Sequence, residues 1–256
     1  MEWKRLARIK QLWWIHILIF IIAGIFFTEF CQKNRESLND EYWRTEQETY
    51  VDQYQKNLQD TINRAEYMKG ISIFSKEGSY AEKNIEKTEA DAQKLLNVIP
   101  EVMKTPFIPF WLGSDLGDYL IIVLIFAVLK GFLQERREEM WGLVRLTKNG
   151  RGQLLVRRLC LMAVLIAVYV CILFLLRFII CSAVLGIFDQ WTAPIQSNAA
   201  FAFFAIPCTI AEYVICFLLA KICGYVIIAW LFYGIFCAIR ENKFLYLVCG
   251  ALLIYF

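Results

Sequence analysis

The amino-acid sequence predicts an all-α, polytopic helical membrane protein with an extracytoplasmic helical-hairpin domain between its first two membrane spans. Three observations support this fold class. Of the 256 residues, 59% are hydrophobic, which is too many for a soluble domain of this length. The apolar residues gather in runs of roughly 18 to 30, and a helix needs about 20 residues to cross a bilayer. Alternating patterns typical of membrane-spanning strands are missing from the sequence, so helices are the expected spanning elements.

The first predicted span lies near the N-terminus. Four basic residues and one acidic residue precede an apolar run from Leu12 to about Phe27. Basic flanks tend to stay in the cytoplasm, and no small-residue cleavage site follows the run. Residues 1–30 are therefore expected to form a cytoplasmic N-terminus and a retained first transmembrane helix.

A long polar segment follows, and residues 31–115 are predicted to form an extracytoplasmic helical domain. Between Gln32 and Asp115 it holds 11 Lys or Arg and 15 Asp or Glu. Apolar residues recur there at three- and four-residue steps in two stretches, which predicts two helices. Gly70 and Gly78 punctuate the chain between them, and Ser79 is placed to cap the second helix. The two stripes are Val51, Tyr54, Leu58, Thr61, Ala65 and Met68, and then Ala81, Ile85, Thr88, Ala92, Leu95 and Ile99.

The next two spans are predicted on either side of a basic loop. Residues 116–134 form the expected second transmembrane helix and residues 158–188 the third. Between Lys130 and Arg158 there are eight basic and three acidic residues. This excess of positive charge predicts a cytoplasmic loop over residues 135–157, which agrees with the direction of the first span. Trp111 is expected at the outer interface, where aromatic residues gather.

The C-terminal third is harder to divide. Residues 189–243 are predicted to hold an outer loop, a re-entrant or amphipathic segment from about Ala199 to Ala220, and a fourth transmembrane helix from Ile222 to Ile239. A single crossing is preferred, because two full crossings would turn the basic end of the run outward. Lys221 is assigned to a break between the two pieces or to a water-filled crevice. Residues 244–256 are expected to start a fifth span, as in a fragment of a longer protein.

The basic loop has a pattern of its own, "EEMWGLVRLTKNGRGQLLVRR". It can be an ordinary cytoplasmic loop held to anionic lipid by its Arg and Lys side chains. Its acidic start, spaced apolar residues and Asn149-Gly150 turn predict a short amphipathic helix lying along the membrane surface. Such a helix, held between two spans, can pass a push from a cytoplasmic partner to both of them.

The loop resembles the coupling segment of the permease subunits of bacterial type-2 ABC exporters, particularly those of Firmicutes. The motif E-x-x-x-G-x-x-x-L-T-x-x-G-R carries the resemblance, as do the external stretch "SIFSKEGSYAEKNIEKTEADAQKL", the segment "APIQS" and a later "RENK". The resemblance implies a coupling helix that docks on a separate cytoplasmic ATPase. The implied ATPase-coupling residues are Glu138, Glu139, Gly142, Leu146, Thr147, Gly150 and Arg151.

Two charges interrupt apolar runs and are candidate functional residues. Arg177 and Glu212 would each be costly in lipid without a partner. Arg177 can extend its guanidinium to the outer headgroups. The alternative is an intramembrane pair between Arg177 and Glu212 near the outer end of the bundle.

The sequence lacks the motifs of a nucleotide-binding site and of the common catalytic sites. No GxxxxGK[ST] is present, and His16 is the only histidine, which leaves none for a zinc site or a nucleophile–histidine pair. We therefore expect no enzyme, cofactor or metal site and no nucleic-acid partner.

The resemblance implies a cytoplasmic ABC ATPase, a homodimer or heterodimer of permease subunits, and membrane lipids as partners in a bacterial cytoplasmic membrane. The second hypothesis is a membrane-anchored sensor or assembly factor whose external domain binds a ligand or partner without transport.

Overall fold

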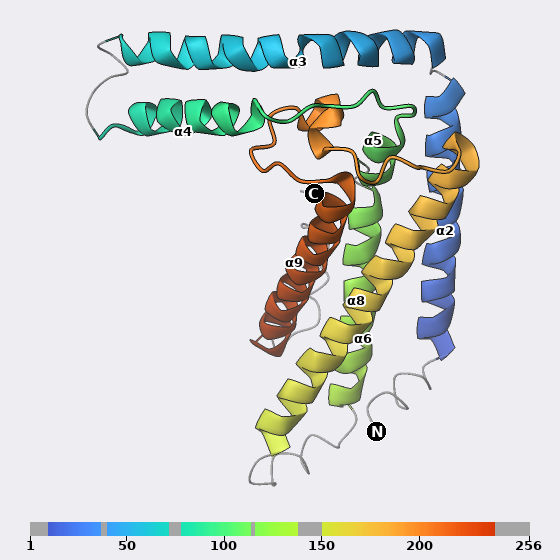
Figure 1. Ribbon diagram of the computed structural model, residues 1–256. Coiled ribbons are helices and arrows are strands. Elements are labelled where there is room, and N and C mark those ends of the chain that lie inside the picture. Colours follow the sequence, from blue (N-terminus) through green and yellow to red (C-terminus); the bar gives the residue numbers. More distant parts are fainter. Residues whose placement is uncertain (1–9, 37–39, 72–77, 114–115, 138–149, 239–256) are drawn as a thin grey trace. The chain divides into compact units, whose positions relative to one another are not determined.

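The computed structural model describes residues 10–36, 40–71, 78–113, 116–137 and 150–238. All regular elements in these ranges are helices (Figure 1). Four helical stretches are long and apolar enough to cross a membrane, namely Ile17–Glu36, Phe107–Leu129, Gly152–Leu185 and Ile210–Ile235. The predicted all-helical class and the presence of membrane-spanning helices are thus confirmed at the level of length and composition.

The chain divides into two compact units. The first, which we call the bundle unit, comprises Met1–Phe30, Ser114–Ile180 and Phe217–Phe256. The second, which we call the helix-pair unit, comprises Cys31–Gly113 and Cys181–Cys216.

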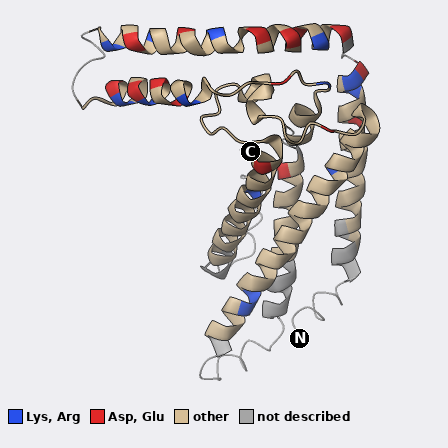
Figure 2. Ribbon diagram, in the orientation of Figure 1, with Lys and Arg blue, Asp and Glu red and all other residues tan. Residues whose placement is uncertain are grey.

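The core of the bundle unit is built from four helices. These are α2 (Lys10–Glu36), α6 (Leu116–Arg137), α8 (Gly150–Leu185) and α9 (Ile210–Ala238). Each helix buries apolar side chains in one shared cluster, which includes Phe27, Leu124, Ile166 and Ala229. Lys, Arg, Asp and Glu are sparse along α8 and α9 (Figure 2). Helices that are apolar on nearly all sides suit a lipid surround.

The helix-pair unit contains α3 (Asp40–Lys69) and α4 (Tyr80–Leu95), which lie side by side (Figure 1). Charged residues mark both helices along their length (Figure 2). Their shared apolar contact is formed by Tyr54, Leu58, Ile62, Ala92, Leu95 and Val98.

The predicted stripes are confirmed at Tyr54, Leu58, Ala92 and Leu95, which are buried. The prediction also holds at Ala65, which is buried. It is wrong at Thr88 and Ile99, which are exposed. Ile62 and Val98 are buried in addition to the predicted residues.

A short helix, α5 (Phe107–Leu112), ends the polar segment. Phe107 stacks on Phe188, and Trp111 meets Trp191 edge to face with ring centroids 5.9 Å apart. Trp111 is buried in this aromatic cluster. Its expected place at the outer membrane interface stays a prediction.

The loop from Gly186 to Thr209 is held around Gln196. The Gln196 side-chain amide donates to the carbonyls of Phe204 and Ile206 at 2.9 Å each. The Tyr50 hydroxyl donates to the Gln196 carbonyl at 2.6 Å. Burial, followed by the neighbouring Tyr54, raises the pKa of Tyr50, so this hydroxyl keeps its proton and remains a donor at neutral pH.

The start of α4 has the glycine and the capping serine that the sequence predicts. Gly78 has a φ of 75°, in the left-handed region that favours glycine. Ser79 Oγ accepts from the Glu82 amide at 3.1 Å, and Glu82 Oε2 accepts from the Gly78 amide at 2.7 Å. This is a capping arrangement in which both residues satisfy backbone donors near the helix end.

Replacing Ser79 with alanine is expected to destabilise the first turn of α4 by about 1 kcal/mol, because the cap hydrogen bond is lost. Hydrogen exchange of the amides around Glu82 measures the effect. Thr88→Ala is the matched control, since Thr88 is an exposed hydroxyl residue within α4 whose side chain donates to the Asn84 carbonyl. Equal exchange in Ser79→Ala and the control would contradict the capping role.

Candidate functional site

An ion pair joins two of the apolar helices in the bundle unit. Lys221 Nζ, in α9, donates to Asp118 Oδ1, in α6, at 2.6 Å. The side chains are 24% and 39% exposed, respectively. Asp118 lies in the first turn of α6, where the helix dipole favours negative charge. The sequence places each charge at or inside an apolar run, and the structure gives each one an opposite partner.

Two aromatic residues of α9 complete this site. The Lys221 ammonium lies 5.0 Å from the centroid of the Phe217 ring, a distance at which the ring face attracts a cation. Tyr225 lies one turn after Lys221 on the same helix and is largely buried. The ion pair can help to hold α6 and α9 in one register.

This pairing corrects the predicted break at Lys221. The structure has one continuous helix, α9, from Ile210 to Ala238, in place of a re-entrant piece to Ala220 and a crossing from Ile222. The reason is electrostatic, because Asp118 neutralises the lysine where an unpaired charge would be costly. A helix can therefore carry Lys221 without interruption.

Most of the proposed coupling residues lie outside the described residues. Glu138, Glu139, Gly142, Leu146 and Thr147 fall within residues 138–149. Gly150 and Arg151 are the first two residues of α8, whereas the third transmembrane helix is predicted to start at residue 158. Their coupling role stays a prediction.

Arg177 lies inside the bundle unit. It is 7% exposed, and its guanidinium carbon lies 5.2 Å from the centroid of the Phe27 ring. Cation–π contact of this kind partly offsets the cost of removing a guanidinium from water. The structure therefore gives Arg177 a contact other than lipid headgroups.

Glu212 has a local role at the start of α9. Its Oε2 accepts from the Thr209 amide at 2.8 Å, and its own amide donates to Thr209 Oγ1 at 3.3 Å. Thr209 and Glu212 thus have the T-x-x-E spacing of a capping box. This pattern is readable in the sequence and explains an exposed glutamate there. The pairing of Glu212 with Arg177 stays a prediction.

Comparison of the chain with protein-family models, with curated proteins and with solved structures gives no match.

Proposed function

We propose that the chain is the permease subunit of a type-2 ABC exporter. A separate cytoplasmic ATPase would hydrolyse ATP, and this subunit would use that work to move an amphipathic substrate outward, such as a peptide, an antibiotic or a lipid-like compound. The turn over residues 135–157 would dock on the ATPase through Glu138, Glu139, Gly142, Leu146, Thr147, Gly150 and Arg151.

One structural observation supports this proposal above the others. The helices on either side of the turn, α6 and α8, bury side chains in the same apolar cluster, as Leu129 and Met162 illustrate. Closely packed side chains leave few voids that could absorb a displacement. Force applied to the turn would therefore reach both helices and the rest of the bundle unit. The Asp118–Lys221 pair adds a contact between α6 and α9 that can form in one state and break in another.

The proposal includes a topology. The N-terminus and the turn would face the cytoplasm of a bacterium, and residues 31–115 would lie outside as a helical domain. Two copies, or one copy and a relative, would form the transport path.

Charge reversal at Arg151 is expected to reduce co-purification of the ATPase with the full chain by at least about tenfold, because a like charge would replace an attractive contact at the docking site. Gly142→Pro is expected to have a similar effect, because proline distorts a helix. ATP turnover of the complex is the second measurement. Arg64→Glu is the matched control, since Arg64 is exposed on α3.

Two results would contradict the proposal. One is an intact complex with unchanged ATP turnover in both variants. The other concerns an Asn149→Cys variant in which the native cysteines have been replaced. If a membrane-impermeant reagent added to intact cells labels this cysteine, the turn lies outside the cell.

A second candidate function is a membrane-anchored sensor or assembly factor. The specific observation in its favour is that the helix-pair unit contains a pocket of its own. Binding of an ATPase by the chain distinguishes the two functions, since only the exporter requires an ATPase partner.

A further inference from the structure

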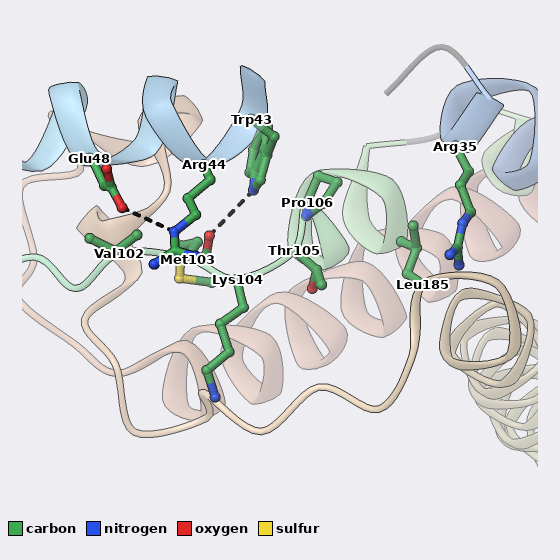
Figure 3. Close-up of a pocket in the computed structure, with 10 residues that line it drawn as sticks. All are labelled: Arg35, Trp43, Arg44, Glu48, Val102, Met103, Lys104, Thr105, Pro106 and Leu185. Carbon is green, nitrogen blue, oxygen red and sulfur yellow. Dashed lines mark hydrogen bonds and ion pairs between the residues drawn. The ribbon is translucent and has the colours of Figure 1, made fainter. Parts of the chain in front are cut away.

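The helix-pair unit contains a pocket of about 690 Å³, within the size range of pockets that hold small ligands. We call it the Arg44 pocket. It lies between the start of α3 and the stretch from Val102 to Pro106, with Arg35 and Leu185 at its other end (Figure 3).

The rim of the pocket is cationic. Arg35, Arg44 and Lys104 line it with a single acid, Glu48. Lys104 is engaged by Asp189 at 2.5 Å, and this hydrogen bond lowers the pKa of Asp189. Arg35 forms no ion pair with any residue in the described part of the chain.

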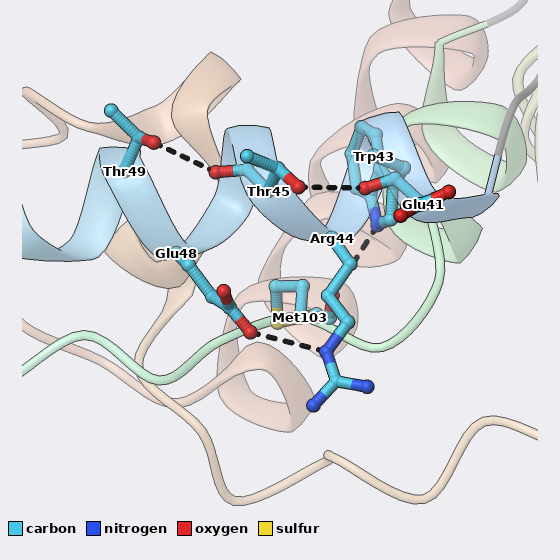
Figure 4. A network of polar contacts seen from close by, with 7 residues as sticks. All are labelled: Glu41, Trp43, Arg44, Thr45, Glu48, Thr49 and Met103. Atoms are coloured by element: carbon cyan, nitrogen blue, oxygen red, sulfur yellow. Dashed lines mark hydrogen bonds and ion pairs between the residues drawn. The ribbon is translucent and has the colours of Figure 1, made fainter.

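Arg44 is oriented by one contact and keeps donors for another. Its Nε donates to Glu48 Oε1 at 3.1 Å, and Figure 4 shows both terminal nitrogens pointing away from that carboxylate. Within the described residues, these two nitrogens make no hydrogen bond. A guanidinium with two parallel donors free is suited to the oxygens of a phosphate or carboxylate.

The inner surface of the pocket is apolar and fixed. Met103 is 2% exposed, and Leu185 and Pro106 line the wall. The Trp43 indole is held by a hydrogen bond from Nε1 to the Met103 carbonyl at 3.3 Å (Figure 3). A ligand bound at the rim would therefore meet a preformed apolar surface beneath its charged group.

Two of the lining residues lie at the ends of candidate membrane spans. Arg35 is in the last turn of the stretch Ile17–Glu36, and Leu185 is the last residue of Gly152–Leu185. Residues at the ends of spans lie at the depth of lipid headgroups, where anionic amphiphiles are concentrated.

We propose that the Arg44 pocket binds the anionic phosphate head of an amphiphile. Arg44 would hold the phosphate oxygens, and Trp43 and Met103 would contact the adjoining apolar part, while Arg35 and Leu185 line the other end of the pocket (Figure 3). The net positive rim disfavours a head that carries its own cation. This inference depends on the helix-pair unit alone, so it stands or falls independently of coupling to an ATPase.

Binding of a short-chain phosphatidylglycerol to the purified full chain in neutral detergent, measured by calorimetry, tests the proposal. We expect saturable binding that inorganic phosphate weakens and that short-chain phosphatidylcholine does not match. Arg44→Gln is expected to raise the Kd about tenfold, since a charge-assisted fork is lost. Arg44→Lys should also weaken binding, because it keeps the charge and loses the two-pronged geometry.

The Glu48→Gln variant is expected to bind the phospholipid more tightly, a result that a misfolded protein cannot give. Removing the competing carboxylate is expected to lower the Kd about threefold, because a change of one charge near the surface has a modest effect. The matched controls are Arg64→Gln and Glu46→Gln, exposed positions on α3 that do not line the pocket. Both should leave the Kd unchanged.

The proposal is overturned if phosphatidylglycerol and phosphatidylcholine bind alike, if Arg44→Gln behaves as Arg64→Gln does, or if Glu48→Gln leaves the Kd unchanged. Native mass spectrometry identifies the source of the ligand. A phospholipid retained by the chain and lost in Arg44→Gln indicates the bilayer. Saturable short-chain binding without a retained lipid indicates a soluble amphiphile with the same head chemistry.

Discussion

Replacing Lys221 with methionine is expected to destabilise the bundle unit by about 2 kcal/mol, because the Asp118 carboxylate loses its partner while part of it stays shielded from water. The expected cost is below that of a fully buried pair, since Asp118 is 39% exposed on its side chain. For a chain of this size the apparent melting temperature in detergent should fall by roughly 4 to 8 °C.

The double replacement Asp118→Asn with Lys221→Met separates pairing from the individual side chains. If the pair is the source of the effect, the double variant should recover most of the lost stability, because neither charge is left alone. Lys94→Met is the matched control. Lys94 pairs with Asp91 on the exposed face of α4, where ion pairs contribute little. Strictly additive losses in the double variant would show that Lys221 and Asp118 act separately.

Truncating Leu58 to alanine should produce the largest loss in the helix-pair unit. Leu58 is 0% exposed and sits in the cluster that α3 and α4 share. Leucine-to-alanine changes at such sites cost about 3 kcal/mol, from lost burial and the cavity left behind. At tenfold for each 1.4 kcal/mol, the open population of this helix pair should rise roughly a hundredfold.

Limited proteolysis of the purified full chain measures this opening, since cleavage follows the open population when reclosing is fast. Cleavage within α3 and α4 should accelerate in Leu58→Ala. Ile99→Ala is the matched control, because Ile99 is an exposed apolar residue just beyond α4. Similar cleavage rates in both variants would mean that α3 and α4 do not depend on their shared cluster.

Features that arise from local periodicity and capping were predictable from the sequence. The stripe through Tyr54 and Leu58 requires only the helical repeat, and Ser79 required only its position before a helical pattern. The apolar runs likewise indicated membrane-spanning helices, because length and hydrophobicity are local properties.

Features that depend on distant partners were not predictable in the same way. Lys221 was expected to interrupt a helix, since nothing near it in the sequence neutralises it. Asp118 does so from 103 residues away. The Arg44 pocket was not predictable for the same reason, because Arg35, Met103 and Leu185 line one pocket only after folding. Glu212 shows the opposite case: the short-range partner Thr209 was overlooked in favour of a distant one.

The length of α8 has a consequence for how the protein fits different membranes. At 1.5 Å per residue, its 36 residues extend about 54 Å, against a hydrocarbon core of about 30 Å. A helix in such excess leans more in thin bilayers and stands straighter in thick ones. Its inclination, and with it the direction in which Gly150 enters the helix, would therefore vary with the acyl-chain length of the host lipid.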